Sequence, residues 1–363
     1  MMIRRKTRKV KVGSVAIGGN AGVSIQSMTK TDTRDVRATV RQINELERLG
    51  CDIIRVAVVD REAARAITGI KKGIKIPIVA DIHFHYGLAL EAIKAGADKI
   101  RLNPGNIRRK EDIAEVVRLA RRQKVPVRIG VNAGSVTGEG AKGKGHGVRK
   151  SGLADTMVEA TARYVKIFEE LDFHDIVISL KASDVNETLE AYRHMAELCD
   201  YPFHIGITEA GSLRSGLVKS GVGIGILLAE GLGDTLRVSL TGDPADEVVA
   251  GIDILNALAL RKKKIEVISC PTCGRCEVDL VSIVDELNAK LAANNQRPMT
   301  DKCIKVAVMG CVVNGPGESR GADIGIAAGK GCGILFKNGK VAGKVQEKDF
   351  VKVLLAEIKK AQR

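Results

Sequence analysis

The cysteines in the last quarter of the chain have the types and spacing of metal ligands. Residues 270–276 read Cys-Pro-Thr-Cys-Gly-Arg-Cys, and residues 310–318 read Gly-Cys-Val-Val-Asn-Gly-Pro-Gly-Glu. A Cys-x-x-Cys turn directs two thiolates at one metal, but a zinc ribbon needs a second turn of the same kind. The second segment offers one cysteine and then a glutamate. This asymmetry favours an iron–sulfur cluster with an incomplete cysteine set, in which one iron has an exchangeable ligand.

Two other interpretations of the Cys-x-x-Cys turn stay open on spacing alone. One is a structural zinc site, and the other is a redox dithiol. The dithiol motif of the thioredoxin type accompanies a βαβ pattern, which is not evident around residues 270–276. A zinc-stabilised, basic nucleic-acid-binding barrel is therefore the competing class of protein, and it predicts a colourless protein that contains zinc.

Composition limits the classes of protein. The 363 residues fit one large and one small domain, and 45% hydrophobic residues can form a core. Aromatic residues are scarce at 3%, which argues against binding of single-stranded nucleic acid by stacking. The net charge of +15 indicates an acidic partner, although the basic tracts 4–6 and 261–264 are interpreted as solvated surface. Eight unevenly spread cysteines and the lack of a long apolar run predict a cytoplasmic protein that does not enter a membrane.

Residues 20–260 alternate between strand and helix patterns. Strands are predicted at 23–28, 53–59, 76–81, 99–102, 125–131, 175–180, 203–208 and 235–240. Helices are predicted at 35–49, 61–72, 87–95, 109–123, 154–171, 185–198, 214–229 and 245–260. This alternation predicts a TIM barrel. The last hundred or so residues predict a small α+β domain that carries the cysteine turns after its strands.

Active sites of TIM barrels lie at the carboxyl ends of the strands. Basic and amide side chains recur there, with few acids: Arg55, Asp81, His83, Arg101, Asn103, Arg128, Asn132, Lys181, Thr208, Glu209, Arg237 and Ser239. Several arginines at one mouth can bind phosphate oxygens in pairs, so the pattern predicts a ligand with more than one phosphate group. Glu209 is a candidate general acid or base, or else an ion-pair partner of a nearby cation. Asp81 and His83 have the same two interpretations.

The segment 136–150 is rich in Gly and Lys. It lacks the Gly-Lys-Ser/Thr ending of a Walker loop. It is interpreted as a flexible loop after the fifth strand, either a lid over an anionic ligand or a simple insertion.

Together these segments resemble a known family. Residues 268–275 and 310–318 are similar to the cluster signatures of bacterial 4-hydroxy-3-methylbut-2-enyl diphosphate synthases. Further similar segments lie at the predicted strand ends, at 79–84, 101–106, 181–184, 206–211 and 233–240. The resemblance covers nearly the whole chain.

The resemblance implies two domains, a TIM barrel that binds substrate (1–263) and a ferredoxin-like or sulfite-reductase-like domain with a [4Fe–4S] cluster (264–363). It implies an oxidoreductase that opens and dehydrates 2-C-methyl-D-erythritol 2,4-cyclodiphosphate in the non-mevalonate pathway of isoprenoid synthesis. Flavodoxin or ferredoxin would supply the electrons, and a homodimer is expected. The implied cluster ligands are Cys270, Cys273, Cys311 and Glu318.

The same resemblance gives roles to the strand-end residues. Glu209, Asp81 and His83 are predicted to be catalytic. The substrate would be bound by Arg55, Arg101, Asn103, Arg128, Asn132, Lys181, Arg237 and Ser239. One departure from the family pattern is Cys276, where a residue other than cysteine is expected. Cys276 could replace Glu318 as the fourth ligand and close the site. A dihydropteroate-synthase-like barrel is rejected because it leaves Cys270, Cys273 and Cys311 unexplained.

Overall fold

The protein is described from a computed structural model that covers residues 3–83, 85–104, 107, 109–136, 152–261, 265–293, 303–313 and 315–362. The segment 136–150 therefore lies almost wholly outside the described residues. The chain divides into two compact units, residues 1–261 and 262–363. The boundary predicted from the sequence lies at residue 263, and the functions predicted for the two parts remain predictions.

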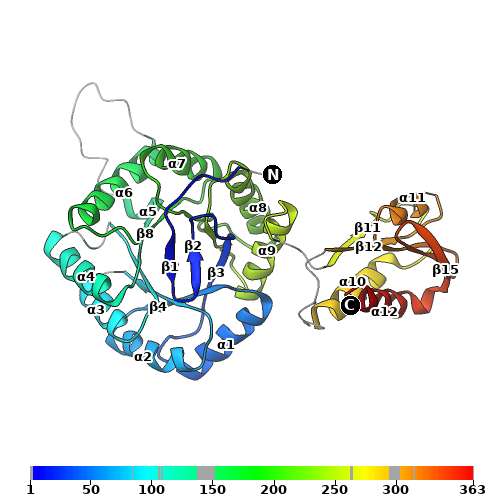
Figure 1. Cartoon of the computed structure of the whole chain (residues 1–363), viewed down its shortest axis with the longest axis horizontal. Coiled ribbons are helices and arrows are strands. Elements are labelled where there is room, and N and C mark those ends of the chain that lie inside the picture. The colour runs from blue at the N-terminus through cyan, green and yellow to red at the C-terminus, as the bar shows by residue number, and fades with distance from the viewer. Residues whose placement is uncertain are drawn as a thin grey trace. The chain divides into compact units, whose positions relative to one another are not determined.

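Unit 1 is a parallel barrel of eight strands (Figure 1). Its strands are β3 (Ser24–Met28), β4 (Ile53–Val58), β5 (Ile78–Ile82), β6 (Lys99–Leu102), β7 (Val127–Asn132), β8 (Ile176–Lys181), β9 (His204–Ile205) and β10 (Thr235–Leu236). Neighbours along the chain pair in parallel, and β10 pairs with β3. A single parallel bridge between Ile178 and Phe203 joins β8 to β9 and closes the ring. The predicted TIM barrel is confirmed.

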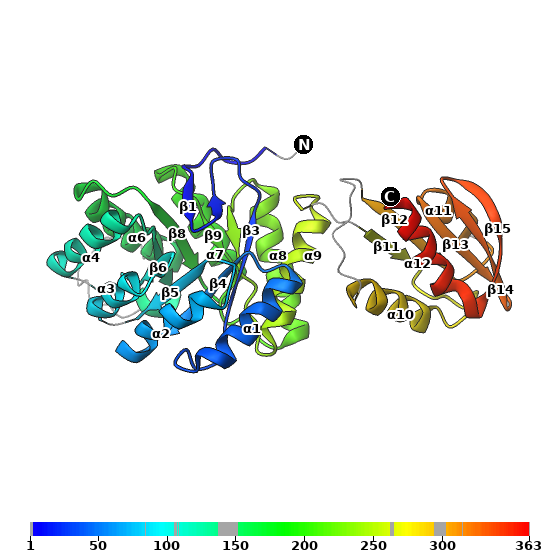
Figure 2. The same ribbon diagram turned by 60° about the horizontal axis from the view of Figure 1, so that its bottom comes forward.

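Helices surround the barrel (Figures 1 and 2). They are α1 (Val36–Leu49), α2 (Arg61–Lys72), α3 (Tyr86–Lys94), α4 (Lys110–Gln123), α5 (Ala133–Val136), α6 (Leu153–Glu170), α7 (Val185–Leu198), α8 (Leu213–Ala229) and α9 (Pro244–Ala257). Asp35, Asp60, Asp184 and Asp243 each accept a hydrogen bond from a first-turn N–H as N-cap residues. Gly50 ends α1 at φ 105°, in the left-handed region that glycine adopts without strain. These local signals determine where the helices begin and end, and so how long the loops are that follow the strands.

A short hairpin closes the amino-terminal end of the barrel. Its strands are β1 (Val10–Val12) and β2 (Val15–Ile17), which pair antiparallel. Their buried side chains pack against Ile53, Val79 and Val177 from three barrel strands. The hairpin does not cover the opposite end of the barrel, where the carboxyl ends of the strands lie.

The interpretation of residues 4–6 as solvated surface is wrong for two of them. Arg4 pairs with the buried Asp234 at 3.1 Å between Nη2 and Oδ1. The guanidinium of Arg5 donates to the carbonyl oxygens of Cys199 and Tyr201 and lies 3.9 Å from the ring centroid of Phe203. These arginines hold the first residues of the chain against the barrel, since each bond satisfies a polar group at its edge.

Unit 2 is a mixed five-stranded sheet with helices. Its strands are β11 (Ile265–Ser269), β12 (Ile304–Met309), β13 (Ile324–Gly329), β14 (Cys332–Lys337) and β15 (Lys340–Gln346), with β11, β12 and β13 parallel and the last two antiparallel. The helices are α10 (Leu280–Ala293), α11 (Gly315–Arg320), the 3₁₀ turn η2 (Glu347–Asp349) and α12 (Phe350–Ala361). Asn338 and Gly339 join β14 to β15 with φ of 46° and 77°, the positive values that a type I′ turn requires.

In the part of the chain that the structure describes, every helix is too short or too polar to cross a lipid bilayer.

Candidate active site and cysteine turns

A cavity of about 230 Å³ opens at the carboxyl ends of the barrel strands. Five of its lining side chains are arginine or lysine, and they come from five different strands or strand ends. The lining residues are Met28, Arg55, Asp81, His83, Arg101, Arg128, Asn132, Ser179, Lys181, Thr208, Arg237 and Ser239. The structure thus brings together most of the residues that the strand-end pattern singled out.

Asp81 is the central carboxylate of this cavity. Its oxygens lie 3.6 Å from Arg55 Nε, 3.2 Å from Arg101 Nη1 and 3.4 Å from His83 Nε2. Burial raises the pKa of the Asp81 carboxyl, but Arg55, the hydrogen bond from His83 and Arg101 outweigh burial and hold that pKa well below its usual range. Asp81 is therefore an anion that orients two guanidinium groups.

Arg128 and Lys181 are buried basic side chains, and the structure gives no ion pair for either of them among the residues it describes. Burial, and then the neighbouring arginines, lower the pKa of both groups. Among the described residues, Nε and Nη1 of Arg128 have no hydrogen-bond partner. Donors held unpaired in a closed cavity are suited to an anion with several oxygens, because such a ligand offsets their mutual repulsion.

Gly130 shows how closely this cavity is built. Nη2 of Arg101 donates to Gly130 O at 3.0 Å. A Cβ at position 130 would lie 2.7 Å from Arg101 Nε, so only glycine leaves room for the guanidinium. The absence of a side chain at position 130 of β7 makes room for the Arg101 side chain.

Two predicted residues do not line the cavity. Asn103 follows β6 and is buried. Glu209 follows the lining residue Thr208, is exposed, and has φ 51° in the left-handed region. A left-handed residue other than glycine costs about 1–2 kcal/mol, and such strain is concentrated at functional sites. The roles predicted for Asn103 and Glu209 stay predictions.

The strand-end pattern missed three residues of this region. Ser179 lies two residues before Lys181 on β8, so the period of two along a strand could have identified it. Met28 ends β3, but its apolar side chain gave no chemical signal. Glu247 lies on α9, where its carboxylate reaches back to Arg237 with Oε2 at 3.3 Å from Nη2. No pattern in the sequence connects Glu247 with a strand end.

The two cysteine turns of unit 2 follow the carboxyl ends of two neighbouring strands, β11 and β12. Strands β11 and β12 pair in parallel with Ser269 opposite Val308, so the two segments leave the sheet side by side. With α10 between them they form a βαβ unit, which the sequence pattern around residues 270–276 did not reveal. The N–H of Gly310 donates to Cys270 Sγ at 3.4 Å, which links the first turn to the second. Cys311 is buried, whereas Cys273 and Glu318 are exposed.

These positions test the predicted ligand set. Thiolates with one carboxylate are the donor chemistry of an iron–sulfur site, and an N–H bond to a ligand sulfur is typical of such sites. Yet within the residues that the structure describes, no three side chains of His, Cys, Asp or Glu lie close enough together to hold a metal ion. The four residues have the donor chemistry of a cluster site, and both turns follow the carboxyl ends of neighbouring strands. In this structure, however, the side chains themselves are not close together.

Cys276 is packed between the turns. Its Sγ donates to Val278 O at 3.3 Å, and the N–H of the next residue, Glu277, donates to Gly310 O at 2.9 Å. A Cβ at position 310 would collide with Cys276 Sγ, while its next neighbours would lie at 3.4 Å or more. The thiol thus fills the space that glycine leaves at position 310.

This packing predicts the result of a paired substitution. Gly310→Ala is expected to destabilise unit 2 by about 1–3 kcal/mol, because the new methyl group overpacks against Cys276. Adding Cys276→Ala removes the clashing sulfur and should restore most of that loss. Thermal unfolding of the full chain measures both variants, with Cys276→Ala alone as the control. Equal instability of the single Gly310 variant and the double variant would contradict the packing argument.

The two units together place the chain in the class of TIM-barrel enzymes that carry a cysteine-bearing α+β unit. Its sequence matches the family model described as the GcpE TIM-barrel domain over residues 7–252. It also matches the model of the GcpE protein C-terminal domain over residues 266–360. The chain belongs to the GcpE family.

Curated relatives agree over their whole length. A protein of Geobacter sulfurreducens named 4-hydroxy-3-methylbut-2-en-1-yl diphosphate synthase (flavodoxin) is 53% identical over 358 residues, which cover 99% of this chain and 98% of that protein. A protein of the same name from Thermodesulfovibrio yellowstonii is 54% identical and covers 99% of this chain and 100% of its own length. Among solved structures, a dihydropteroate synthase of Xanthomonas albilineans is similar at a TM-score of 0.48 and 15% identity, over 70% of this chain and 97% of that one.

Proposed function

We propose that this chain is an oxidoreductase of the non-mevalonate pathway, which converts 2-C-methyl-D-erythritol 2,4-cyclodiphosphate into 4-hydroxy-3-methylbut-2-enyl diphosphate. Two electrons and two protons enter, one ring C–O bond and one C–OH bond break, and water leaves. The observation that carries the proposal is full-length identity above 50% to synthases of this name. The cationic cavity of the barrel supports it, because the substrate is a compact anion with two phosphate groups.

In this proposal the barrel binds the diphosphate. Arg55, Arg101, Arg128, Lys181 and Arg237 donate to its phosphate oxygens, with Asn132 and Ser239 at the rim. Ring opening leaves a phosphate oxygen with additional negative charge. Cations fixed in a cavity of low dielectric stabilise that charge as it develops, and they need no rearrangement to do so.

Two residues near the cavity, His83 and Glu209, are proposed to transfer protons. His83 lines the cavity and its Nε2 lies 3.4 Å from Asp81, which can hold the imidazole in one orientation. In this proposal His83 delivers a proton to the oxygen that leaves as water. Glu209 remains the second proposed acid or base, next to the lining residue Thr208.

Unit 2 supplies the electrons in this proposal. Cys270, Cys273, Cys311 and Glu318 would hold a [4Fe–4S] cluster, which would pass single electrons from a reduced carrier to the substrate. The carrier is proposed to be flavodoxin, which the names of the relatives contain, with ferredoxin as the alternative. The net charge of +15 suits docking of an acidic carrier.

The proposed assembly is a homodimer. Helix α8 leaves Leu217, Val218 and Val222 with 38%, 64% and 48% of their surface exposed, and Val249 of the neighbouring α9 is 44% exposed. These residues form an apolar surface that a second copy of the chain could cover. Sedimentation of the purified protein at a single-chain mass would contradict the dimer.

Anaerobic purification followed by turnover of the cyclic diphosphate tests the proposed function. We expect a brown protein with about four irons per chain that forms the hydroxymethylbutenyl diphosphate when a strong one-electron donor is supplied. A colourless protein with stoichiometric zinc, and without iron after reconstitution, would support the zinc-stabilised nucleic-acid-binding alternative. Iron without turnover would reject the substrate.

A further inference from the structure

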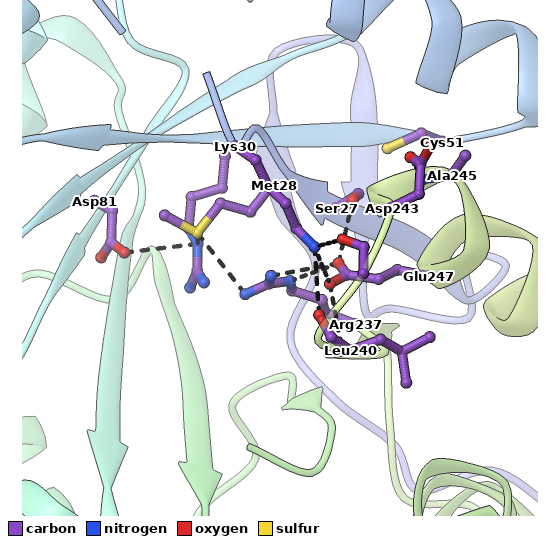
Figure 3. Close-up of polar contacts among 12 residues, drawn as sticks. Ser27, Met28, Lys30, Cys51, Asp81, Arg237, Leu240, Asp243, Ala245 and Glu247 are labelled. Carbon is purple, nitrogen blue, oxygen red and sulfur yellow. Dashed lines mark hydrogen bonds and ion pairs between the residues drawn. The ribbon is translucent and has the colours of Figure 1, made fainter. Parts of the chain in front are cut away.

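Glu247 is a buried carboxylate with no role in the reaction described above. Only 2% of the residue is exposed, and it lies in the first turn of α9, where a negative charge is favoured by the helix dipole. Its Oε2 lies 3.3 Å from Nη2 and 3.4 Å from Nε of Arg237. Figure 3 shows the two side chains pointing toward one another. The side chain therefore meets one edge of a guanidinium group that lines the cavity.

We propose that Glu247 is a positioning residue, which aims Arg237 at the diphosphate and ties the loop that carries Ser239 to the barrel. This inference rests on the proposed function of the cavity, and it concerns a residue outside the cavity lining. Two donors of Arg237 face Glu247 and one N–H of Nη1 approaches Met28 Sδ, which leaves the other N–H groups of Nη1 and Nη2 for the ligand. The planar guanidinium has no freedom to turn away once one of its edges is held.

Repulsion inside the cavity explains why an anchor is needed. Met28 Sδ lies 3.1 Å from Arg55 Nε and 3.8 Å from Arg237 Nη1, so two guanidinium groups approach one thioether. Figure 3 shows the contact between Met28 and Arg237. Each cation also pairs with a carboxylate, Arg55 with Asp81 and Arg237 with Glu247. Without these two carboxylates the cations would separate, because like charges in a buried site repel strongly.

The second oxygen of Glu247 holds the neighbouring loop. Oε1 accepts the backbone N–H of Leu240 at 3.1 Å, directly after Ser239. Lys30, in the loop after β3, has its Nζ 3.9 Å from Oε1, and it also donates to the carbonyl oxygens of Leu240 and Gly242. One carboxylate thus connects the loops that follow β3 and β10. Movement of either loop would shift a cavity residue.

Binding of inorganic diphosphate to the full-length protein, measured by calorimetry, tests this role. Glu247→Gln keeps the shape and can still accept from Leu240, but it loses the charge that holds Arg237. We expect about tenfold weaker binding, in the range of coupling between contacting groups. Asp246→Asn is the matched control, since it removes an exposed acid from the same helical turn. It should bind diphosphate like the parent protein.

A double-mutant cycle separates positioning from a general loss of structure. In an Arg237→Gln background, Glu247→Gln should change diphosphate affinity by less than twofold, because the cation through which it acts is gone. Glu247→Asp keeps the charge and should recover most of the affinity. An equal tenfold loss in both backgrounds, or no loss in either, would overturn the inference.

The same data distinguish this inference from the proposed function. If the parent protein does not bind diphosphate at all, the substrate class of the cavity is wrong. If it binds diphosphate and Glu247→Gln binds equally well, the cavity stands and the positioning role of Glu247 fails.

Discussion

A Cys311→Ser variant purified without oxygen is expected to lose its iron and all turnover while its barrel stays folded. A serine oxygen is a far poorer ligand for iron than a thiolate, and Cys311 is a predicted ligand in the second turn. Cys311 is 8% exposed, so solvent cannot easily supply a substitute donor at its position. Iron and sulfide analysis, the visible spectrum and circular dichroism of the same sample measure the result.

Cys276→Ser is the matched control for that experiment. Cys276 belongs to the first turn, but its Sγ donates to Val278 O and packs over Gly310. We therefore expect this variant to keep about the iron content and turnover of the parent protein. The reverse pattern, with iron lost from Cys276→Ser and retained by Cys311→Ser, would make Cys276 a ligand and overturn the assignment.

The sequence predicts the barrel well because its signals are local. Apolar runs, aspartate N-caps and glycine C-caps each act within one turn, and together they place eight strand–helix units. The seventh and eighth strands are the exceptions. The predicted strands 203–208 and 235–240 shorten to His204–Ile205 and Thr235–Leu236. Gly206 at φ 156° ends the first of them, with the N–H of Thr208 donating to Ala182 O rather than along a ladder.

Most of the charged residues that line the cavity can also be predicted from the sequence, but the contacts that hold them in place cannot. Arg55 and Arg128 lie inside β4 and β7, and Lys181 ends β8. All three line the cavity because neighbouring parallel strands present the side chains of one face together. Glu247 and Met28 act through contacts between elements that are distant in the sequence. Glu247 is separated from Lys30 by more than two hundred residues, and no local pattern encodes that approach. Sequence reasoning therefore finds most of the charged side chains that line the cavity, and it misses the apolar Met28 and the carboxylate of Glu247 that lies behind Arg237.

Asp81→Asn is expected to lower both stability and turnover. Asp81 is the counter-ion of Arg55 and Arg101, and removing one partner of a buried ion pair costs about 3–5 kcal/mol. A neutral amide would also remove a negative charge that opposes phosphate binding, so the two effects compete. Orientation should dominate, because misplaced arginines lose bonds to developing charge, and we expect turnover to fall by about 10²-fold or more.

Asp234→Asn separates these two effects. Asp234 is likewise buried and ion-paired, with Arg4 at 3.1 Å, and it also accepts from the Thr7 hydroxyl and from the backbone N–H of Phe203. This variant should be less stable than the parent protein, but its turnover rate per folded molecule should be unchanged. Turnover in Asp81→Asn that equals that of Asp234→Asn would show that Asp81 only stabilises the fold.

The pH dependence of unfolding gives an independent measure of Asp81. Its folded-state pKa is lowered below the ordinary 3.8, since Arg55, His83 and Arg101 together outweigh burial. A carboxyl whose pKa is lower in the folded state stabilises the protein above its unfolded pKa, and that contribution is lost as the pH falls through the range below about 4. The free energy of unfolding of the parent should therefore fall more steeply with acid than that of Asp81→Asn. Parallel curves for the two proteins would mean that the carboxylate is not held by these cations.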